Sequence, residues 1–167
     1  ELNRIIKDTI NLMKTNDKNI TINFDSEKIY YVKSDIGQLN RVFINLFKNS
    51  IESLKEKHEK KGNFQKKIDI EIQLINDYIN IELHDNGTGF ANNDPKVFSK
   101  PYFTTKKKGS GLGLSIVTKI INDHNGTIEF LNYNKGAKIK ITFPKLNVSW
   151  NTNCLLYTSD AADEVLG

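Results

Sequence analysis

The chain has 167 residues, of which 38% are hydrophobic and 26% charged, and its formal net charge is +4. These values are typical of one globular domain with a hydrophobic core, and the chain is short for two domains. No apolar run reaches membrane-spanning length, no signal peptide is visible, and a single cysteine excludes an internal disulfide. Since the first residue is Glu1 rather than methionine, we expect the chain to be a piece of a longer protein.

The net positive charge raises one early alternative, a basic module that binds nucleic acid. The basic residues are dispersed, however, except for the run Lys106-Lys107-Lys108. A solvated surface accounts for such a distribution better than a nucleic-acid footprint does. We therefore expect no nucleic-acid partner, and weak, salt-insensitive binding to DNA would dismiss that alternative.

The first half of the chain shows clear helix and strand periodicities. Apolar residues at helical spacing predict a helix over residues 2–13, and alternation predicts strands at 20–24 and 29–33. Asp35 with Gln38 three residues later is typical of a helix start. The helix that follows is predicted to bury one face, made of Leu39, Val42, Phe43, Leu46, Phe47, Ser50, Ile51 and Leu54. The polar stretch 55–67 predicts the end of this helix and an exposed loop.

The second half of the chain alternates like a sheet with one buried face. Residues 68–74 and 79–83 predict a hairpin around Asn76-Asp77, and residues 127–132 and 137–143 predict two closing strands. A helix beginning near Leu114 lies between these hairpins. The order of elements predicts an α/β fold, a two-layer sandwich with helices on one face of a mixed, largely antiparallel sheet.

Alternation along the strand at 79–83 places Asp85 on the apolar face of the sheet. A buried carboxylate is unfavourable unless a donor pairs with it, so this position indicates a ligand-facing group. Asp85-Asn86-Gly87 also fits an ordinary hairpin turn. A hairpin turn would be followed directly by a second strand. No strand is predicted there, because residues 90–108 are irregular and contain Pro95 and Pro101. A loop of that length is typical of a functional lid, which favours the ligand-facing interpretation.

Two further patterns are compatible with ligand binding. Asn45 and Asn49 lie on one side of their helix at the margin of its apolar stripe, where pocket-lining and solvated positions fit equally well. Gly109, Gly111 and Gly113 lead into a helix, and glycines at a helix N-terminus suit a phosphate. By itself the glycine pattern also fits a flexible turn, and it matches neither a P-loop nor a Rossmann fingerprint.

Taken together, three stretches resemble the N, G1 and G2 boxes of the histidine-kinase-like ATPase superfamily, and in particular the ATP-binding domain of bacterial sensor histidine kinases. They are the segments 45–52, 84–89 and 106–115. The resemblance extends from about Leu2 to Pro144 and implies the Bergerat-type fold. Phe98 and the segment 101–106 resemble the F-box and lid of nitrogen-regulation-type kinases, which favours the kinase branch.

The resemblance implies a role for each motif residue. Asn49 would hold Mg²⁺ against the ATP phosphates, with Asn45 as a supporting contact, and Asp85 would accept a hydrogen bond from the adenine amino group. Lys106 is the better candidate for a phosphate-contacting lysine and Lys48 the weaker one. The remaining expected ATP-binding residues are Gly87, Gly89, Gly109, Gly111, Leu112, Gly113 and Leu114.

The function that the resemblance implies is to bind Mg-ATP and donate its γ-phosphoryl group to a histidine on a separate dimerisation domain. A response regulator receiver domain would be a further partner. The expected location is the cytoplasmic portion of a kinase whose membrane attachment the sequence leaves open. None of His58, His84 and His124 is in a credible phosphoacceptor motif.

Two alternatives within the superfamily stay open, a self-contained ATPase switch and a serine kinase of the anti-sigma type. The ATPase branches carry a glutamate, as general base for water, one helical turn before the Mg²⁺ asparagine. Asn45 occupies that position here, which argues against hydrolysis. The segment 98–106 counts against the serine kinase.

The expected domain covers residues 1–148. The tail at 149–167 differs from everything before it, and Cys154–Glu164 resembles the translated end of a sequencing-library adapter. We expect this tail to lie outside the domain.

Overall fold

The computed structural model describes residues 1–14, 19–24, 26, 28–90, 113–134 and 136–146. In chain order the elements are α1 (Leu2–Lys14), β1 (Ile20–Phe24), α2 (Ile36–Lys61), β2 (Lys66–Ile75), β3 (Tyr78–Asp85), α4 (Gly113–Asp123), β4 (Thr127–Tyr133) and β5 (Gly136–Pro144). The predicted lid beyond Phe90 and the predicted tail lie outside the described residues. No helix in the described ranges is long and apolar enough to cross a membrane.

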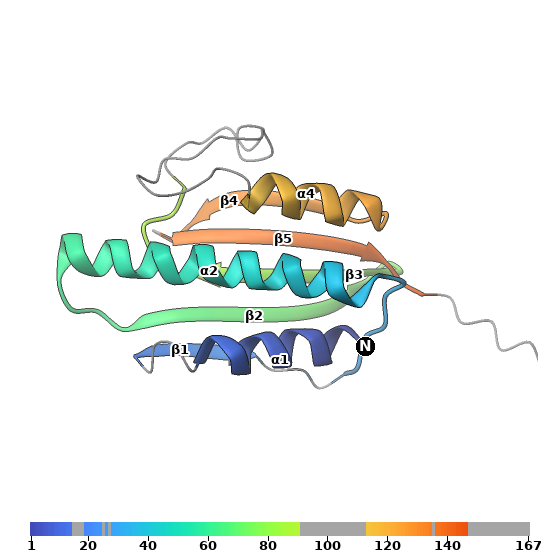
Figure 1. Cartoon of the computed structure of the whole chain (residues 1–167), viewed down its shortest axis with the longest axis horizontal. Coiled ribbons are helices and arrows are strands. Elements are labelled where there is room, and N and C mark those ends of the chain that lie inside the picture. Colours follow the sequence, from blue (N-terminus) through green and yellow to red (C-terminus); the bar gives the residue numbers. More distant parts are fainter. Residues whose placement is uncertain (15–18, 25, 27, 91–112, 135, 147–167) are drawn as a thin grey trace, which may run out of the picture.

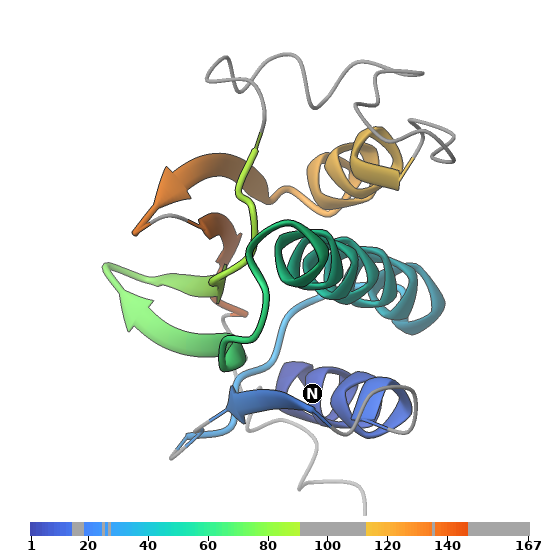
Figure 2. The same ribbon diagram turned by 90° about the vertical axis from the view of Figure 1, so that its left-hand side faces the viewer.

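The five strands form one mixed sheet in the order β1-β2-β3-β5-β4. β1 pairs with β2 in parallel, and the other three pairs are antiparallel. The helices α1, α2 and α4 cover the same face of this sheet. Figure 2 shows them end-on, and Figure 1 shows them lengthwise. The predicted two-layer α/β sandwich is therefore confirmed.

The hydrophobic core lies between the sheet and its helices, with α2 at its centre. All eight residues that the sequence predicted for the buried face of α2 are buried. The facing strands contribute every second residue, so that Ile79, Ile81, Leu83 and Asp85 of β3 point into the core. Asn76 and Asp77 have φ of 48° and 64°, as a two-residue hairpin turn requires.

α2 begins at the predicted cap. The Asp35 carboxylate accepts a hydrogen bond from the backbone N–H of Gln38 at 2.8 Å, which satisfies one of the free donors of the first turn. His124, which directly follows α4, contacts the same cap. Its Nε2 accepts a hydrogen bond from the N–H of Asp35 at 3.0 Å. The start of the central helix is thus fixed by its own cap and by a neighbouring helix.

Replacing Asp35 by alanine should lower the free energy of unfolding by about 1 kcal/mol, because the N-cap acceptor is lost. Denaturant unfolding followed by circular dichroism measures the change. Asp8→Ala is the matched control, since Asp8 makes only an exposed ion pair with Arg4 and should have a small effect. Equal stability of the Asp35→Ala variant and the wild type would contradict the capping role.

The end of α2 differs from the sequence prediction. The stretch expected to be a helix end and a loop continues the helix to Lys61, and only residues 62–65 form the loop. The Glu and Lys residues there are good helix formers, and the ion pair between Glu56 and Lys60 at 2.6 Å is four residues apart. Gly62, with φ of 80°, ends the helix and donates its N–H to the His58 carbonyl. A helix polar on all sides carries no apolar periodicity, which is why the prediction was too short.

The predicted strand at 29–33 is also wrong, since these residues belong to no strand. The N–H of Tyr30 donates to the Asn3 side chain at 2.8 Å, and the Tyr30 carbonyl accepts from the N–H of Leu2 at 2.9 Å. The Asn3 amide also donates to the Lys28 carbonyl at 2.7 Å. Tyr30 therefore pairs both of its backbone groups with the start of α1 instead of with a neighbouring strand.

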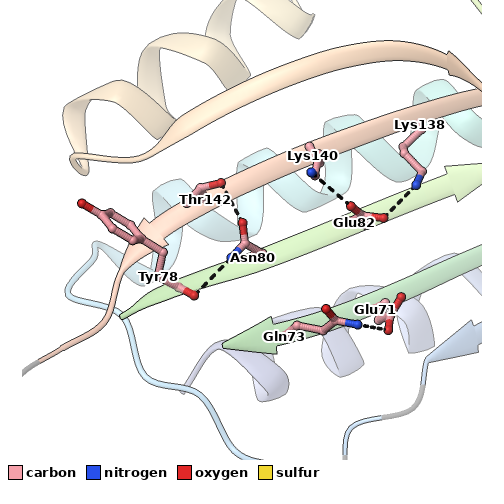
Figure 3. A network of polar contacts seen from close by, with 8 residues as sticks. All are labelled: Glu71, Gln73, Tyr78, Asn80, Glu82, Lys138, Lys140 and Thr142. Carbon is pink, nitrogen blue, oxygen red and sulfur yellow. Dashed lines mark hydrogen bonds and ion pairs between the residues drawn. The ribbon is translucent and has the colours of Figure 1, made fainter. Parts of the chain in front are cut away.

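The outer face of the sheet is polar, and several of its charges form ion pairs. Figure 3 shows the Glu82 carboxylate between Lys138 at 2.8 Å and Lys140 at 3.5 Å, with Asn80 and Thr142 hydrogen bonded beside them. The hydrogen bond from Lys138 lowers the pKa of Glu82 below its ordinary value. This surface fits an antiparallel sheet with one face in the core and one in solvent.

Candidate functional site

The candidate site is centred on Asp85, the last residue of β3. Its neighbours across the sheet are Ile68 on β2 and Ala137 on β5, and its side chain is 2% exposed. The predicted inward orientation of this carboxylate is confirmed. A carboxylate among the apolar residues of the core is unfavourable unless hydrogen-bond donors pair with it. Asp85 therefore needs such donors in the folded protein.

Both Asp85 oxygens accept hydrogen bonds. Ser50 on α2 donates its hydroxyl to Oδ2 at 2.8 Å, and the backbone N–H of Gly87 donates to Oδ1 at 2.9 Å. Burial raises the pKa of Asp85 above its ordinary value, and these two donors oppose the rise. The carboxylate is held in one orientation at the contact between β3 and α2.

The loop that follows Asp85 packs closely against α2. A Cβ at Gly87 would lie 2.2 Å from the Ser53 hydroxyl and 2.8 Å from the Ser53 carbonyl carbon, so only glycine fits there. The same hydroxyl accepts from the N–H of Thr88 at 2.9 Å. Gly89 has φ of 76°, in the left-handed region that favours glycine. The structure thus places Gly87 beside Asp85, and Gly89 against Asn132 and Gly136.

Asn86 ties this loop to the start of β2. Its side chain accepts from the N–H of Lys67 at 2.9 Å and donates to the carbonyl of Gln65 at 2.8 Å. Its own N–H donates to the Lys67 carbonyl at 3.3 Å, and its carbonyl accepts from the Lys57 ammonium group. The Asn86 side chain therefore extends the hydrogen bonding between β2 and β3 by one residue beyond Asp85.

The exit of the loop is fixed to β4. Asn132 accepts from the N–H of Phe90 at 2.7 Å and donates to the Phe90 carbonyl at 3.0 Å, as a paired strand would. The Phe90 ring also packs edge-on against Phe130, with centroids 5.8 Å apart. The last described residue before position 91 is therefore anchored at both its backbone and its ring.

Asn45 and Asn49 face the start of α4. A Cβ built on Gly113, the first residue of α4, would lie 3.5 Å from Asn45 Oδ1 and 3.9 Å from Asn49 Nδ2. The Asn45 amide donates to the Arg41 carbonyl at 2.8 Å, which turns its oxygen towards Gly113. Both asparagines are half-buried and lie at the contact between α2 and α4, and their role in lining a ligand pocket stays a prediction.

Asp85, the asparagines and the start of α4 are brought together through one helix. Asn49 and Ser50 are consecutive on α2, and they reach α4 and β3 respectively. Leu114 lies in the first turn of α4 and packs partly against the core. Lys48 is exposed on α2, and none of the described contacts joins it to this site. Lys106, Gly109, Gly111 and Leu112 lie outside the described residues.

The side chains that face the start of α4 and could contact a metal ion are the amides of Asn45 and Asn49. The described residues contain no group of three or more His, Cys, Asp or Glu side chains placed to hold an ion. Mg²⁺ takes oxygen ligands and usually keeps water and phosphate oxygens in its shell, so it needs few protein ligands. The amides of Asn45 and Asn49 on α2, which face the N-terminus of α4, are compatible with that requirement.

Each of the three histidines contacts neighbouring residues of the fold. His84 is on the outer face, with its ring edge-on to Tyr133 at 5.1 Å. His124 lies between the N–H of Asp35 and the carbonyl of Ile120, 2.7 Å from its Nδ1. His58 is near the end of α2, with its ring 6.5 Å from that of Phe64. None of these contacts brings a histidine ring onto the Asp85 carboxylate.

Sequence reasoning missed four residues that build the site: Ser50, Ser53, Asn86 and Asn132. Ser50 was predicted as a buried residue, and only the three-dimensional structure shows its bond to Asp85. Asn86 was interpreted as a turn residue. The contacts of Ser53 and Asn132 join segments 35 and 42 residues apart, which no local pattern reveals.

Comparison with known proteins agrees with this geometry. The family model described as histidine kinase-, DNA gyrase B-, and HSP90-like ATPase matches residues 34–147. Sporulation kinase B of Bacillus subtilis (strain 168) is 33% identical over 147 residues, which are 86% of this chain and 33% of the relative. The chain thus spans about a third of the length of this curated relative.

Solved structures with the same fold include histidine kinase domains. The nucleotide-free catalytic domain of histidine kinase ThkA superposes with a TM-score of 0.73 at 28% identity, covering 86% of this chain and 91% of that one. ThkA in complex with response regulator protein TrrA superposes with a TM-score of 0.68 at 27% identity, covering 87% of this chain and 41% of that one.

Proposed function

Because the chain belongs to the family of histidine kinase-, DNA gyrase B- and HSP90-like ATPases, we propose that it is the ATP-binding portion of a sensor histidine kinase. In this proposal residues 1–148 form the domain, which binds ATP with Mg²⁺ and donates the γ-phosphoryl group to a histidine on a separate helical domain. The similarity to sporulation kinase B and to the ThkA domain supports the kinase branch over the gyrase and HSP90 branches.

The observation that carries the proposal is the buried Asp85 carboxylate at the end of β3. It is 2% exposed and oriented by Ser50 and Gly87. Carboxylate oxygens have more than one acceptor site each, so Asp85 can accept a further hydrogen bond from an amino group. The adenine amino group is such a donor, and Gly87 and Gly89 keep side chains away from the base.

In this proposal Asn45, Asn49 and the start of α4 bind the phosphates of ATP. Mg²⁺, when bound, would neutralise phosphate charge and align the γ-phosphoryl group for transfer. Asn49 is the proposed protein ligand, with Asn45 as a supporting contact beside Gly113. The N-terminus of α4 is the positive end of the helix dipole, which favours an anion there.

Transfer to a separate histidine fits the chain better than hydrolysis. Position 45 is an asparagine, so no carboxylate stands there to deprotonate water. The contacts of His58, His84 and His124 are structural. We therefore propose that the acceptor lies on the dimerisation domain of the parent kinase, in the cytoplasm, and that a response regulator takes the phosphoryl group next. The complex of ThkA with TrrA supports the last partner.

Incubation with γ-labelled ATP tests the proposal. The isolated chain should bind ATP without labelling itself or releasing phosphate at an appreciable rate, because no nucleophile is held in line. Adding the helical phosphoacceptor domain of the parent kinase should give acid-labile label on that domain. Label on the 167-residue chain itself, or rapid phosphate release, would contradict the proposal.

The metal role of Asn49 has its own test. Asn49→Ala should weaken ATP binding chiefly when Mg²⁺ is present, because an amide ligand acts through the ion. Lys48→Ala is the matched variant, because Lys48 directly precedes Asn49 on α2. Any effect of its ammonium group on ATP binding should persist without the metal. Calorimetric titrations with Mg²⁺ and with a chelator make the comparison. Equal weakening of Asn49→Ala under both conditions would remove Asn49 as a ligand.

A further inference from the structure

Ser50 is a buried polar residue at the contact between the two halves of the candidate site. It is 1% exposed, it directly follows Asn49 on α2, and its hydroxyl lies 2.8 Å from Asp85 Oδ2. We propose that Ser50 is a positioning residue that orients the Asp85 carboxylate and keeps it ionised for recognition of the adenine amino group. The nucleotide part of this inference rests on the function proposed above.

The physical argument begins with the cost of burying a carboxylate. An ionised carboxylate in the core needs donors, and a hydrogen bond to the charged form favours that form. The Ser50 hydroxyl donates to Asp85 Oδ2 and the Gly87 N–H to Oδ1, and the backbone of Ala137 on β5 also hydrogen bonds to the carboxyl. Donors from different elements fix the plane of the carboxylate. Its remaining acceptor sites then have a defined direction.

Few charged groups near Asp85 could replace this donor. His84, the preceding residue, is on the opposite face of β3, where its Nε2 lies 3.3 Å from the Tyr133 carbonyl. Lys57 on α2 donates to the Asn86 carbonyl, and the neighbours on β2 and β5 are Ile68 and Ala137. Ser50 is therefore the side-chain donor to Asp85 within the described part of the chain.

Burial disfavours the ionised form of Asp85, and the hydrogen bonds from Ser50, Gly87 and Ala137 and the charge of His84 favour it. Desolvation raises the pKa of this carboxyl, and the Ser50 hydrogen bond is the largest effect that lowers it. Removing the hydroxyl should therefore raise the pKa of Asp85 further. A protonated Asp85 carries a proton on one oxygen and loses its charge, so it is a weaker acceptor for an amino group.

Ser53 provides a matched control on the same helix. It lies one turn after Ser50, and its hydroxyl also contacts the loop, at the Thr88 N–H 2.9 Å away. It makes no described hydrogen bond to Asp85. A general loosening of the loop from α2 should therefore follow either serine substitution, whereas a change in the ionisation of Asp85 should follow Ser50→Ala alone.

The test measures Asp85 directly in the nucleotide-free protein. Carboxyl ¹³C NMR titrations of the wild type, Ser50→Ala and Ser53→Ala follow its pKa, which should rise in Ser50→Ala and stay unchanged in Ser53→Ala. An Asp85 titration in Ser50→Ala identical to that of the wild type would overturn the proposal, as would an equal rise in both variants. Because ATP is absent, this result stands even if the proposed function fails.

Titrations with ATP across a range of pH give the second readout. Ser50→Ala should weaken ATP binding about three- to tenfold, and the loss should grow as the pH falls and Asp85 takes up its proton. Any loss in Ser53→Ala should be independent of pH over the same range. A loss in Ser50→Ala that does not change with pH would overturn the role in ionisation. Absence of ATP binding in all three proteins would contradict the proposed function and leave the NMR result to decide the role of Ser50.

Discussion

The Asp85→Asn variant is expected to bind ATP about ten- to a hundredfold more weakly than the wild type. Loss of a hydrogen bond that involves a charged group costs about 1.5–3 kcal/mol, which corresponds to this range. The asparagine keeps the size of the side chain, and its oxygen can still accept from the Gly87 N–H. Its amide can donate to the Ser50 hydroxyl, which is able to accept. The loss should therefore fall on the ligand.

The same variant should be at least as stable as the wild type at pH 7. Burial raises the pKa of Asp85 in the folded protein, so the stability that this group contributes is fully present below its unfolded pKa. That contribution is lost as the pH rises through the folded pKa, where the buried carboxyl must ionise. Asparagine does not ionise. Any excess in the free energy of unfolding of the variant over the wild type at pH 7 should therefore disappear in acid.

Two measurements on the Asp85→Asn variant are needed, a calorimetric titration with ATP and denaturant unfolding at pH 4 and pH 7. Unchanged ATP affinity would refute the role of Asp85. Unfolding of the variant at neutral pH would show that the carboxylate is needed for the fold and not for a ligand. A Glu71→Gln variant is the control, because it removes an acidic charge from the outer face of the sheet.

The second large effect is expected for Gly87→Ala. The added Cβ would lie 2.2 Å from the Ser53 hydroxyl, which can rotate, and also 2.8 Å from the Ser53 carbonyl carbon, which cannot. Overpacking of this kind typically costs about 1–3 kcal/mol, and here the strain separates the loop from α2. Both the unfolding midpoint and the affinity for ATP should fall, as thermal unfolding and calorimetry would show.

Gly113→Ala is the matched comparison within the site. Its Cβ would have only ordinary contacts, 3.5 Å or more from the asparagine side chains, and alanine favours a helix over glycine. The thermal midpoint of this variant should stay near that of the wild type or rise. If the two alanine variants unfold at the same temperature, the close packing of Gly87 on Ser53 is not what holds the loop in place.

The sequence alone predicted the parts of the site that depend on local periodicity. Alternation along β3 was enough to place Asp85 in the core, because side chains of a strand alternate between its faces whatever its partners are. The four-residue spacing of Asn45 and Asn49 likewise placed both on one side of α2. The contact of this side with the start of α4 is tertiary, and the sequence left it undecided.

The misplaced elements show where local periodicity fails. Residues 29–33 alternate like a strand, but the backbone N–H and C=O of Tyr30 hydrogen bond to the Asn3 side chain and to Leu2 at the start of α1. Residues 55–61 have no apolar stripe, yet helix-forming side chains and the cap at Gly62 continue α2. Ser50 and Asn132 were missed because a buried hydroxyl or an exposed amide acquires its role only from a distant partner.

The most direct test of the account compares ATP and GTP as ligands of the same protein. Adenine presents an amino donor where guanine presents a carbonyl acceptor, so an ionised Asp85 should attract the first and repel the second. Calorimetric titration at neutral pH with Mg²⁺ should therefore show ATP binding at least about tenfold tighter than GTP, with the preference reduced in Asp85→Asn. Equal affinities for the two nucleotides in the wild type would contradict an adenine site at Asp85.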